Sequence, residues 1–409
     1  MSFRRVRTGL VAAMLAGLCA LAQANTTVHA ASPPLLLAQN DISLMPGGPA
    51  EIETESVPPP DIAVQPQDQQ QGTPGAVRIA LLLPLRSESL RNAAAMVRDG
   101  FVAAFEKSRD PGISLTVVET GDAAQDVLDA YTGAQPAYDI MVGPLSRSGV
   151  AAIAARGVVG KPTIALTPSD AVADANASPA LLLMGLSLED DARQAAEWAA
   201  TDLPGEGALV VSTATAWQRR AARAFQAAWQ RRGQPAEMFE LSATGGNLSA
   251  SALAQLQERL RGSRPGLVFA ALDAGQARQL RESIGADLPM YGTSQLNPYS
   301  QQGWAGVEAR ADMNGVRFID LPWLLRADAA SPVRLVGTSE VVRSADLERL
   351  YALGMDAYQV ARGVAAQRGA FDVNGATGRL KVNMGAGQAR FERKASPAVY
   401  QDGIVAPLP

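Results

Sequence analysis

The sequence predicts an α/β protein of two lobes, each a doubly wound, mostly parallel sheet. Short apolar runs of strand length alternate with segments of helical periodicity from about residue 77 onward. The same alternation starts again after residues 187–190. The length of 409 residues also exceeds what one hydrophobic core accommodates. Length and alternation together therefore indicate two cores of ordinary domain size.

The composition is that of a globular exported protein. Apolar residues make up 47%, charged residues 19% and aromatic residues 5%, and the net charge is −4. The basic residues are scattered rather than gathered in a stripe, so the electrostatic footprint of a phosphate-backbone binder is missing. We expect no nucleic-acid partner.

Residues 1–30 have the pattern of an export signal. Arg4, Arg5 and Arg7 precede an apolar run over residues 10–21, and the small residues at 22–24 offer a cleavage site, so cleavage is expected near 24 or 30. The apolar run is too short to cross a bilayer as a mature helix. The mature chain is therefore expected in the periplasm.

The single cysteine, Cys19, lies inside this signal, so the mature chain is expected to have no disulfide. Lipid attachment at Cys19 would need a small residue before it, and Leu18 stands there. Cys19 is therefore a poor lipidation site, and outer-membrane association through a lipid remains the alternative.

Residues 31–76 are rich in Pro, Gln and acidic residues and contain neither Lys nor Arg. Such a segment buries too little apolar surface to offset its ordering entropy, which predicts a disordered tether. We interpret it as a spacer, with a specific docking motif as the alternative.

The first series of elements opens with a near-continuous apolar run at residues 77–85, as expected of a parallel strand buried on both faces. A helix follows, with apolar residues at helical spacing from Ala94 to Phe105. Further strands are predicted at residues 113–119, 138–142, 163–166 and 181–184.

The second series begins with a Ser-x-x-Asp helix cap at residues 187–190. Strands are predicted at 208–212 and 266–272, a helix at 217–231, and a return crossing at 289–295.

The final segments complete the two lobes. Residues 315–323 are predicted to rejoin the first lobe as a strand, and Ser344 to cap a helix with small residues on its inner face. A hairpin should follow, with arms at 379–383 and 388–393. The first lobe would comprise residues 77–187 and 305–369, and the second lobe residues 188–295 and 370–409.

The order of these pieces resembles the type I periplasmic binding proteins, the family of branched-chain amino-acid receptors. It is more closely similar to the C-terminal domain of the penicillin-binding protein activator LpoA family. The stretches that carry this resemblance are IALLLPL (79–85), VGPL (142–145), LSLEDDAR (186–193), YGTS (291–294), DLPWLL (320–325) and RLYALGMDAY (349–358).

The resemblance implies a non-enzymatic activator of peptidoglycan synthesis, held at or near the outer membrane, that contacts a class A penicillin-binding protein. Two departures count against it. The family's long forms carry a helical-repeat domain before the binding fold, where this chain shows only the short tether. The lipid-attachment cysteine is also poorly formed.

Catalytic patterns are missing from the sequence. The only histidine, His29, falls in the signal or tether, which removes histidine-based chemistry from the folded part. No Ser-x-x-Lys, Gly-x-Ser-x-Gly or Walker-type loop occurs. Glu189, Asp190 and Asp191 stand at a predicted helix start, where acids favour the macrodipole. We expect no enzyme activity, no cofactor and no metal.

The alternative function is a solute-binding protein of an ABC transporter, which would hold an amino acid or similar small ligand between the lobes. Polar residues after predicted strand ends could hold a carboxylate or amino group. These candidates are Ser87, Ser146, Ser148, Thr167, Ser169, Thr213, Asp273 and Tyr291. Helix capping and turn formation, expected at every strand-to-helix junction, are the preferred interpretation of the same residues. The loop at residues 86–91 is bulkier and more charged than the Gly-bearing loop usual in amino-acid receptors, which counts against transport.

Two aromatic residues could instead mark a protein contact. Tyr299 and Trp304 lie in an irregular stretch, and Trp and Tyr are enriched in binding hot spots. Trp323 continues an apolar run and is expected in the core.

Overall fold

The computed structural model describes residues 75–168, 178–297, 311–325, 345–385 and 387–408, all of which belong to one compact unit. The predicted export signal, with Cys19, and nearly all of the tether lie outside the described residues, as do Ser169, Tyr299 and Trp304.

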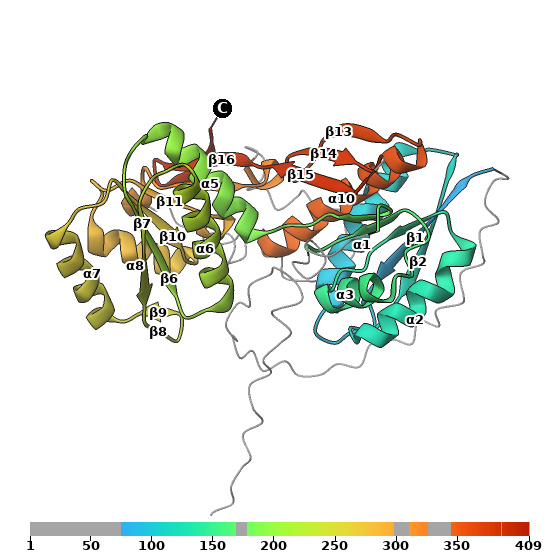
Figure 1. Ribbon diagram of the computed structural model, residues 1–409, viewed down its shortest axis with the longest axis horizontal. Coiled ribbons are helices and arrows are strands. Elements are labelled where there is room, and N and C mark those ends of the chain that lie inside the picture. Colours follow the sequence, from blue (N-terminus) through green and yellow to red (C-terminus); the bar gives the residue numbers. More distant parts are fainter. Residues whose placement is uncertain (1–74, 169–177, 298–310, 326–344, 386, 409) are drawn as a thin grey trace, which may run out of the picture. The chain divides into compact units, whose positions relative to one another are not determined.

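The first sheet is entirely parallel, with strand order β2-β1-β3-β4-β5 (Figure 1). Its strands are β1 (Val77–Leu83), β2 (Ile113–Glu119), β3 (Ile140–Val142), β4 (Thr163–Ala165) and β5 (Leu181–Leu183). All five predicted strands are confirmed, with ends that differ by at most two residues.

Both faces of this sheet are covered, which explains the continuous apolar run of β1. Ile79, Leu81 and Leu83 pack into one core with helix α1 (Arg91–Ser108) and helix α10 (Ala345–Ala365). The alternate residues Ala80 and Leu82 pack against helix α2 (Ala124–Ala134) on the other face. The remaining elements of this region are η1 (Gln135–Ala137) and α3 (Arg147–Arg156).

Helices α1 and α10 cross at two glycines. A Cβ atom on Gly100 would collide with the Tyr351 carbonyl, and one on Gly354 would collide with the Val97 carbonyl. The small residues on the inner face of α10 therefore let it approach helix α1 closely.

The second sheet has the strand order β17-β16-β12-β11-β10-β6-β7. Its strands are β6 (Ala208–Thr213), β7 (Ala236–Leu241), β10 (Leu267–Ala271), β11 (Met290–Gly292), β12 (Arg317–Asp320), β16 (Ser396–Gln401) and β17 (Ile404–Pro407). The pairs from β12 to β7 are parallel, whereas β16 and β17 are antiparallel to their neighbours. The sequence analysis did not predict β7, β16 or β17.

Helices cover both faces of the second sheet as well. One core contains residues of α5 (Leu188–Asp202) and α6 (Ala216–Arg231), and the other contains residues of α7 (Ala250–Gly262) and α8 (Ala274–Ile284). Short elements complete the region: β8 (Ala243–Thr244), β9 (Asn247–Leu248), η2 (Ser294–Leu296), η4 (Ala311–Met313) and α9 (Pro322–Leu325).

The predicted return of residues 315–323 to the first lobe is wrong. β12 pairs in parallel with β11 and antiparallel with β16, so it lies inside the second sheet. Phe318 and Ile319 point into the two cores on opposite faces of that sheet. An apolar strand fits the interior of either sheet, and its partner strands β11 and β16 decide between them.

Residues 370–394 were predicted in the second lobe but pack on the first sheet. They form an antiparallel sheet of β13 (Ala370–Asn374), β14 (Arg379–Asn383) and β15 (Arg390–Lys394). Leu380 and Val382 pack into the core of the first sheet. The predicted hairpin is confirmed as β14 and β15.

Candidate functional site

The predicted ligand residues of the first sheet are held by nearby groups. The Ser87 hydroxyl donates to Asp122 (2.7 Å) and accepts from the Leu90 amide (3.1 Å). Ser146 caps α3 by accepting from the Gly149 amide at 3.2 Å, and the Ser148 hydroxyl makes a weak contact with Ser146 at 3.5 Å. The Thr167 side chain is buried beside the Pro168 carbonyl.

The predicted residues of the second sheet are also held within their own region. The Thr213 hydroxyl donates to Gln218 at 2.6 Å, and Asp273 caps α8 by accepting from the Gln276 amide at 2.8 Å. The Tyr291 ring is fully buried, and its hydroxyl donates to Asp202 at 2.8 Å and accepts from Arg317 at 2.9 Å.

Capping and local bonding thus account for Ser87, Ser146 and Asp273, as the simpler interpretation of the sequence had it. Tyr291 is turned into the core between the sheet and α5, where its ring meets Trp198 edge to face. Burial raises the pKa of Tyr291 to about 12, so this hydroxyl stays protonated and continues to donate to Asp202.

Asp122 makes the end of the first sheet unfavourable for an amino-acid carboxylate. Hydrogen bonds from Ser87 and, more weakly, Ser89 keep the pKa of Asp122 below its usual value, so it is an anion at neutral pH. It therefore occupies the Ser87 hydroxyl, one of the predicted donors to a ligand carboxylate, and repels a second negative charge nearby.

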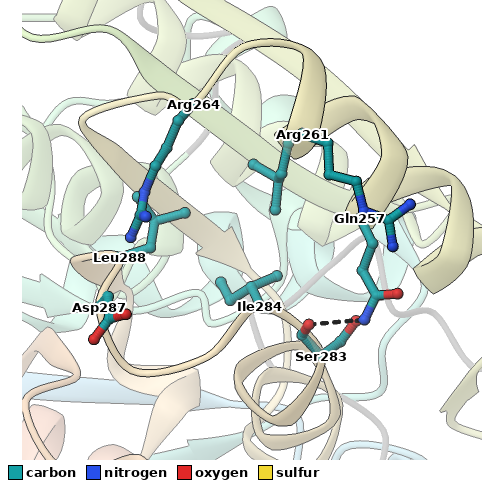
Figure 2. A pocket seen from close by; sticks show the side chains of 8 residues that line it. Gln257, Arg261, Arg264, Ser283, Ile284, Asp287 and Leu288 are labelled. Carbon is teal, nitrogen blue, oxygen red and sulfur yellow. Dashed lines mark hydrogen bonds between the residues drawn. The ribbon is translucent and has the colours of Figure 1, made fainter.

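A surface hollow of about 350 Å³ lies between the C-terminal parts of α7 and α8 (Figure 2). It is lined by Gln257, Leu260, Arg261, Arg264, Ser283, Ile284, Asp287 and Leu288. Gln257 donates to Ser283, and Arg261 is paired with Glu258 while remaining 71% exposed. None of the predicted ligand residues lines this hollow. Its charged lining residues Arg261, Arg264 and Asp287 are exposed, so it lacks the enclosed, mostly apolar lining of a small-molecule site.

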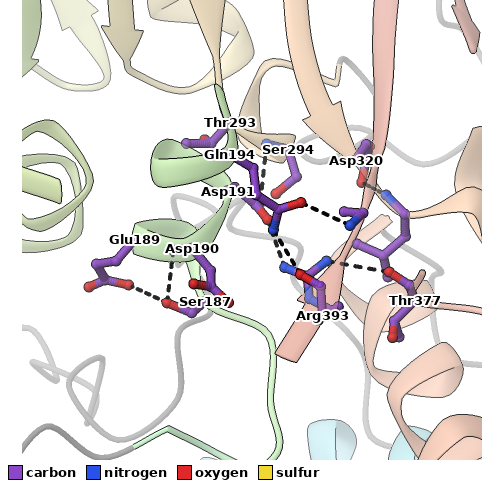
Figure 3. A network of polar contacts seen from close by, with 12 residues as sticks. Ser187, Glu189, Asp190, Asp191, Gln194, Thr293, Ser294, Asp320, Thr377 and Arg393 are labelled. Atoms are coloured by element: carbon purple, nitrogen blue, oxygen red, sulfur yellow. Dashed lines mark hydrogen bonds and ion pairs between the residues drawn. The ribbon is translucent and has the colours of Figure 1, made fainter. Parts of the chain in front are cut away.

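A buried polar assembly of the described chain lies elsewhere, where α5, η2, β12, α10 and β15 meet (Figure 3). We call these residues the crossing network: Asp191, Gln194, Ser294, Asp320, Asp346, Arg349, Asp356, Thr377 and Arg393. Its members come from the segments that connect the two sheets or continue from them.

The first part of the crossing network is the ion pair of Asp191 and Arg393, whose side chains are 3% and 2% exposed and 2.7 Å apart. Arg393 also donates to the Thr377 carbonyl at 3.4 Å. Gln194 fastens the adjacent backbone by donating to the Arg393 carbonyl and accepting from the Ala395 amide. Helix α5 is thereby fixed to the junction of β15 and β16.

The second part centres on Arg349, which is 4% exposed. Its guanidinium contacts Asp320 at 3.1 Å and Asp346 at 2.6 Å, and donates to the Ser294 carbonyl at 2.9 Å. Burial alone lowers the pKa of Arg349, but the two carboxylates outweigh it and raise the pKa above the usual value. The Arg349 cation thus joins three elements: the end of β12, the short helix η2 and the start of α10.

The third part is the Asp356 carboxylate, which holds the turn between β13 and β14. It accepts from the Ala376 amide, the Thr377 amide and the Thr377 hydroxyl at 2.6–2.7 Å. Gly375 packs so closely on this carboxylate that a Cβ there would collide with it. The turn and α10 therefore act as one unit.

The sequence analysis missed this network as a site, although five of its nine residues lie in quoted stretches. Asp191, Ser294 and Asp320 belong to LSLEDDAR, YGTS and DLPWLL, and Arg349 and Asp356 belong to RLYALGMDAY. Asp191 was interpreted only as a helix-start acid, which fits Glu189 and Asp190 better. The available signal was a single charge inside an uncharged stretch of a helix, as Asp356 is within residues 350–358 of α10.

The side chains and helices of the described residues bear on metal binding and membrane insertion. No group of three or more His, Cys, Asp or Glu side chains in that part of the chain could hold a metal ion. Over the same residues, no helix combines the length and apolarity needed to cross a membrane.

Fold and sequence together define the class of this protein. Residues 68–403 match the family described as LppC putative lipoprotein, and the chain belongs to that family. The penicillin-binding protein activator LpoA of Haemophilus influenzae is 26% identical over 344 residues, which are 81% of this chain and 55% of that protein. The chain thus spans about half the length of this relative.

Two solved structures share the fold. The C-domain of Haemophilus influenzae LpoA, described as a regulator of PBP1A, matches with a TM-score of 0.64 and 24% identity over 81% of this chain and 100% of that one. A putative branched-chain amino acid ABC transporter from Chromobacterium violaceum matches with a TM-score of 0.61 and 32% identity over 79% and 99%. The predicted α/β class and the resemblance to both groups are confirmed.

Proposed function

We propose that this chain is a periplasmic, non-enzymatic activator that binds a class A penicillin-binding protein and stimulates peptidoglycan synthesis. Two observations carry the proposal. The family match over residues 68–403 contains in full every described strand except the last. The matching relative from Haemophilus influenzae is named as a penicillin-binding protein activator. The missing catalytic patterns of the sequence support a regulator over an enzyme. Outer-membrane association stays the alternative, with Cys19 a poor lipidation site because Leu18 precedes it.

The decisive experiment measures glycan polymerisation and peptide cross-linking by the class A penicillin-binding protein of the same organism, with and without the purified mature chain. Stimulation together with direct binding is expected. No binding and no stimulation would contradict the proposal for that synthase. The doubly substituted Tyr299→Ala/Trp304→Ala chain tests the predicted contact residues. The matched control is Tyr299→Phe/Trp304→Phe, which keeps an aromatic ring at each position.

Solute binding is the second candidate, favoured by the match to the Chromobacterium violaceum protein. The anionic Asp122 at the end of the first sheet counts against an amino-acid carboxylate there. Native mass spectrometry of the purified chain, followed by titration with branched-chain amino acids, separates the two functions. A retained or saturably bound amino acid would favour transport, and its absence together with synthase stimulation would favour activation.

A further inference from the structure

The outward face of the three-stranded sheet β13-β14-β15 is a candidate docking surface (Figure 1, orange to red). Alternate residues of its strands are exposed, while the others, apart from the ion-paired Arg393, pack into the core of the first sheet. The exposed charged residues are Asp372, Arg379, Lys381, Arg390, Glu392 and Lys394. Four cations against two acids give this face a net charge of +2, in a chain whose total is −4. We call it the basic face.

Three cations of the basic face have no acid opposite them. Arg379 stands directly across from Lys394, and Arg390 stands across from Asn383. Lys381, in contrast, lies between Asp372 on one neighbouring strand and Glu392 on the other. Directly opposed side chains are about 4.5–5.5 Å apart at Cβ, and like charges there destabilise a sheet. The Arg379–Lys394 pair is thus a local cost that an anion lying across the face would offset.

The chain itself supplies a segment of matching chemistry. Residues 41–68 contain six acids and no Lys or Arg: Asp41, Glu51, Glu53, Glu55, Asp61 and Asp68. This acidic segment leads into β1, and Val77 packs against the same core as Phe391 of the basic sheet. As a flexible coil, the chain between Glu55 and Val77 would average about 25 Å end to end, enough to reach a neighbouring surface.

We propose that the acidic segment, residues 41–68, docks on the basic face of its own chain. The three uncompensated cations Arg379, Arg390 and Lys394 would receive its carboxylates. Docking would keep the segment from acting as a fully extended spacer and would cover the face until a stronger anionic partner displaces it. This inference does not depend on the proposed activator function.

The scarcity of lysine provides a direct test. The chain has four lysines, Lys107, Lys161, Lys381 and Lys394, and two of them lie on the basic face. A zero-length carbodiimide reagent joins a carboxylate to a lysine amine as an amide, so peptide mapping of the mature full chain shows which lysines the acidic segment touches. Lys107 is the built-in control. It is exposed at the end of α1, and the Val77 amide bonds to Gly112 just beyond that helix end, so an undocked segment would meet Lys107 readily.

Cross-links from residues 41–68 to Lys394 are expected to exceed those to Lys107 by about fivefold in dilute buffer, and to fall to the Lys107 level in about 1 M salt, where the screening length is about 3 Å. The variant Arg379→Gln/Arg390→Gln keeps Lys394 as the reporter while removing two cations, and should lose most of this excess. Its control, Arg91→Gln/Arg156→Gln, removes two exposed arginines from helices α1 and α3 and should retain the excess of Lys394 cross-links.

Three results would overturn the proposal. Equal cross-linking of Lys107 and Lys394 in dilute buffer would mean that the segment does not dock. Cross-links mainly between isotope-labelled and unlabelled chains would assign the face to a second copy. An excess that persists in the Arg379→Gln/Arg390→Gln variant would show that these cations do not attract the segment.

Discussion

Three predicted ligand residues, Ser146, Thr213 and Asp273, differ from the two longest-range ion pairs of the crossing network in how far along the chain their partners lie. Ser146 and Asp273 accept from amides three residues away, and Thr213 bonds to Gln218 five residues away. Arg393 reaches 202 residues back to Asp191, and Arg349 reaches 29 residues back to Asp320. Local polar residues shape single turns, whereas distant buried pairs decide which segments of the two halves are joined. The following substitutions test this difference, starting with the largest expected effect.

Arg349→Met should destabilise the fold by about 3–5 kcal/mol, because it leaves Asp320 and Asp346 buried without their cation. Chemical denaturation measures the loss. The control is Arg193→Ala, which breaks the half-exposed pair with Asp190 and should cost about 0.5 kcal/mol or less. Similar losses in the two variants would mean that the crossing network stabilises no more than a surface pair.

The Asp191–Arg393 pair should show strong coupling in a double-mutant cycle. Either Asp191→Leu or Arg393→Met leaves one buried group unpaired and should cost about 2–4 kcal/mol. The combined variant removes both charges and should be more stable than the sum of the single losses predicts. Additive losses would show that the two side chains act independently.

Tyr291→Phe separates the ligand interpretation from the structural one. Removing the hydroxyl deletes the bond to Asp202 and should cost about 1 kcal/mol, measured by thermal unfolding. Asp202 and Arg317 remain 3.8 Å apart and can still attract each other. Synthase binding should not change. A loss of amino-acid binding with unchanged stability would restore Tyr291 as a ligand residue.

Ser87→Ala should have the smallest effect, about 0.5–1 kcal/mol at neutral pH, because it removes the acceptor for the Leu90 amide and a donor to Asp122. The pKa of Asp122 should rise toward the ordinary value of 3.8, as carbon-detected NMR titration would show. An acid with a lowered folded-state pKa stabilises the protein above 3.8 and loses that contribution as the pH falls through the folded-state value.

The part of the stability difference that comes from Asp122 should therefore disappear in acid, while the part from the lost Leu90 contact persists. A titration curve for Asp122 that is unchanged in the Ser87→Ala variant would contradict the assigned hydrogen bond.

Apolar runs in the sequence predicted strands well where the neighbouring strands in the sheet are also near along the chain. The five strands of the first sheet follow one another along the chain, and all were located from apolar runs. β7, with its half-exposed alternation, and β16, with Pro397 inside it, gave no such run. β12 was located but assigned to the wrong sheet, because its partner β16 arrives almost 80 residues later.

The candidate site was predicted only in part. Polar residues after strand ends can be recognised in the sequence, and so can their alternative role as helix caps. The structure shows Ser146 and Asp273 in that capping role. The crossing network was hidden, because a charged residue in an apolar helix does not indicate which distant charge will neutralise it.

The sequence by itself determined the alternation of strands and helices, the export pattern, the acidic composition of residues 31–76 and the family stretches, since these depend on residue type and spacing along the chain. Only the tertiary structure decided that Arg349 neutralises Asp320, that Arg393 neutralises Asp191, and that the other cations of β14 and β15 point outward from the first core. Burial makes these pairings obligatory, because an unpaired charge away from water is costly, and burial is a property of the folded chain.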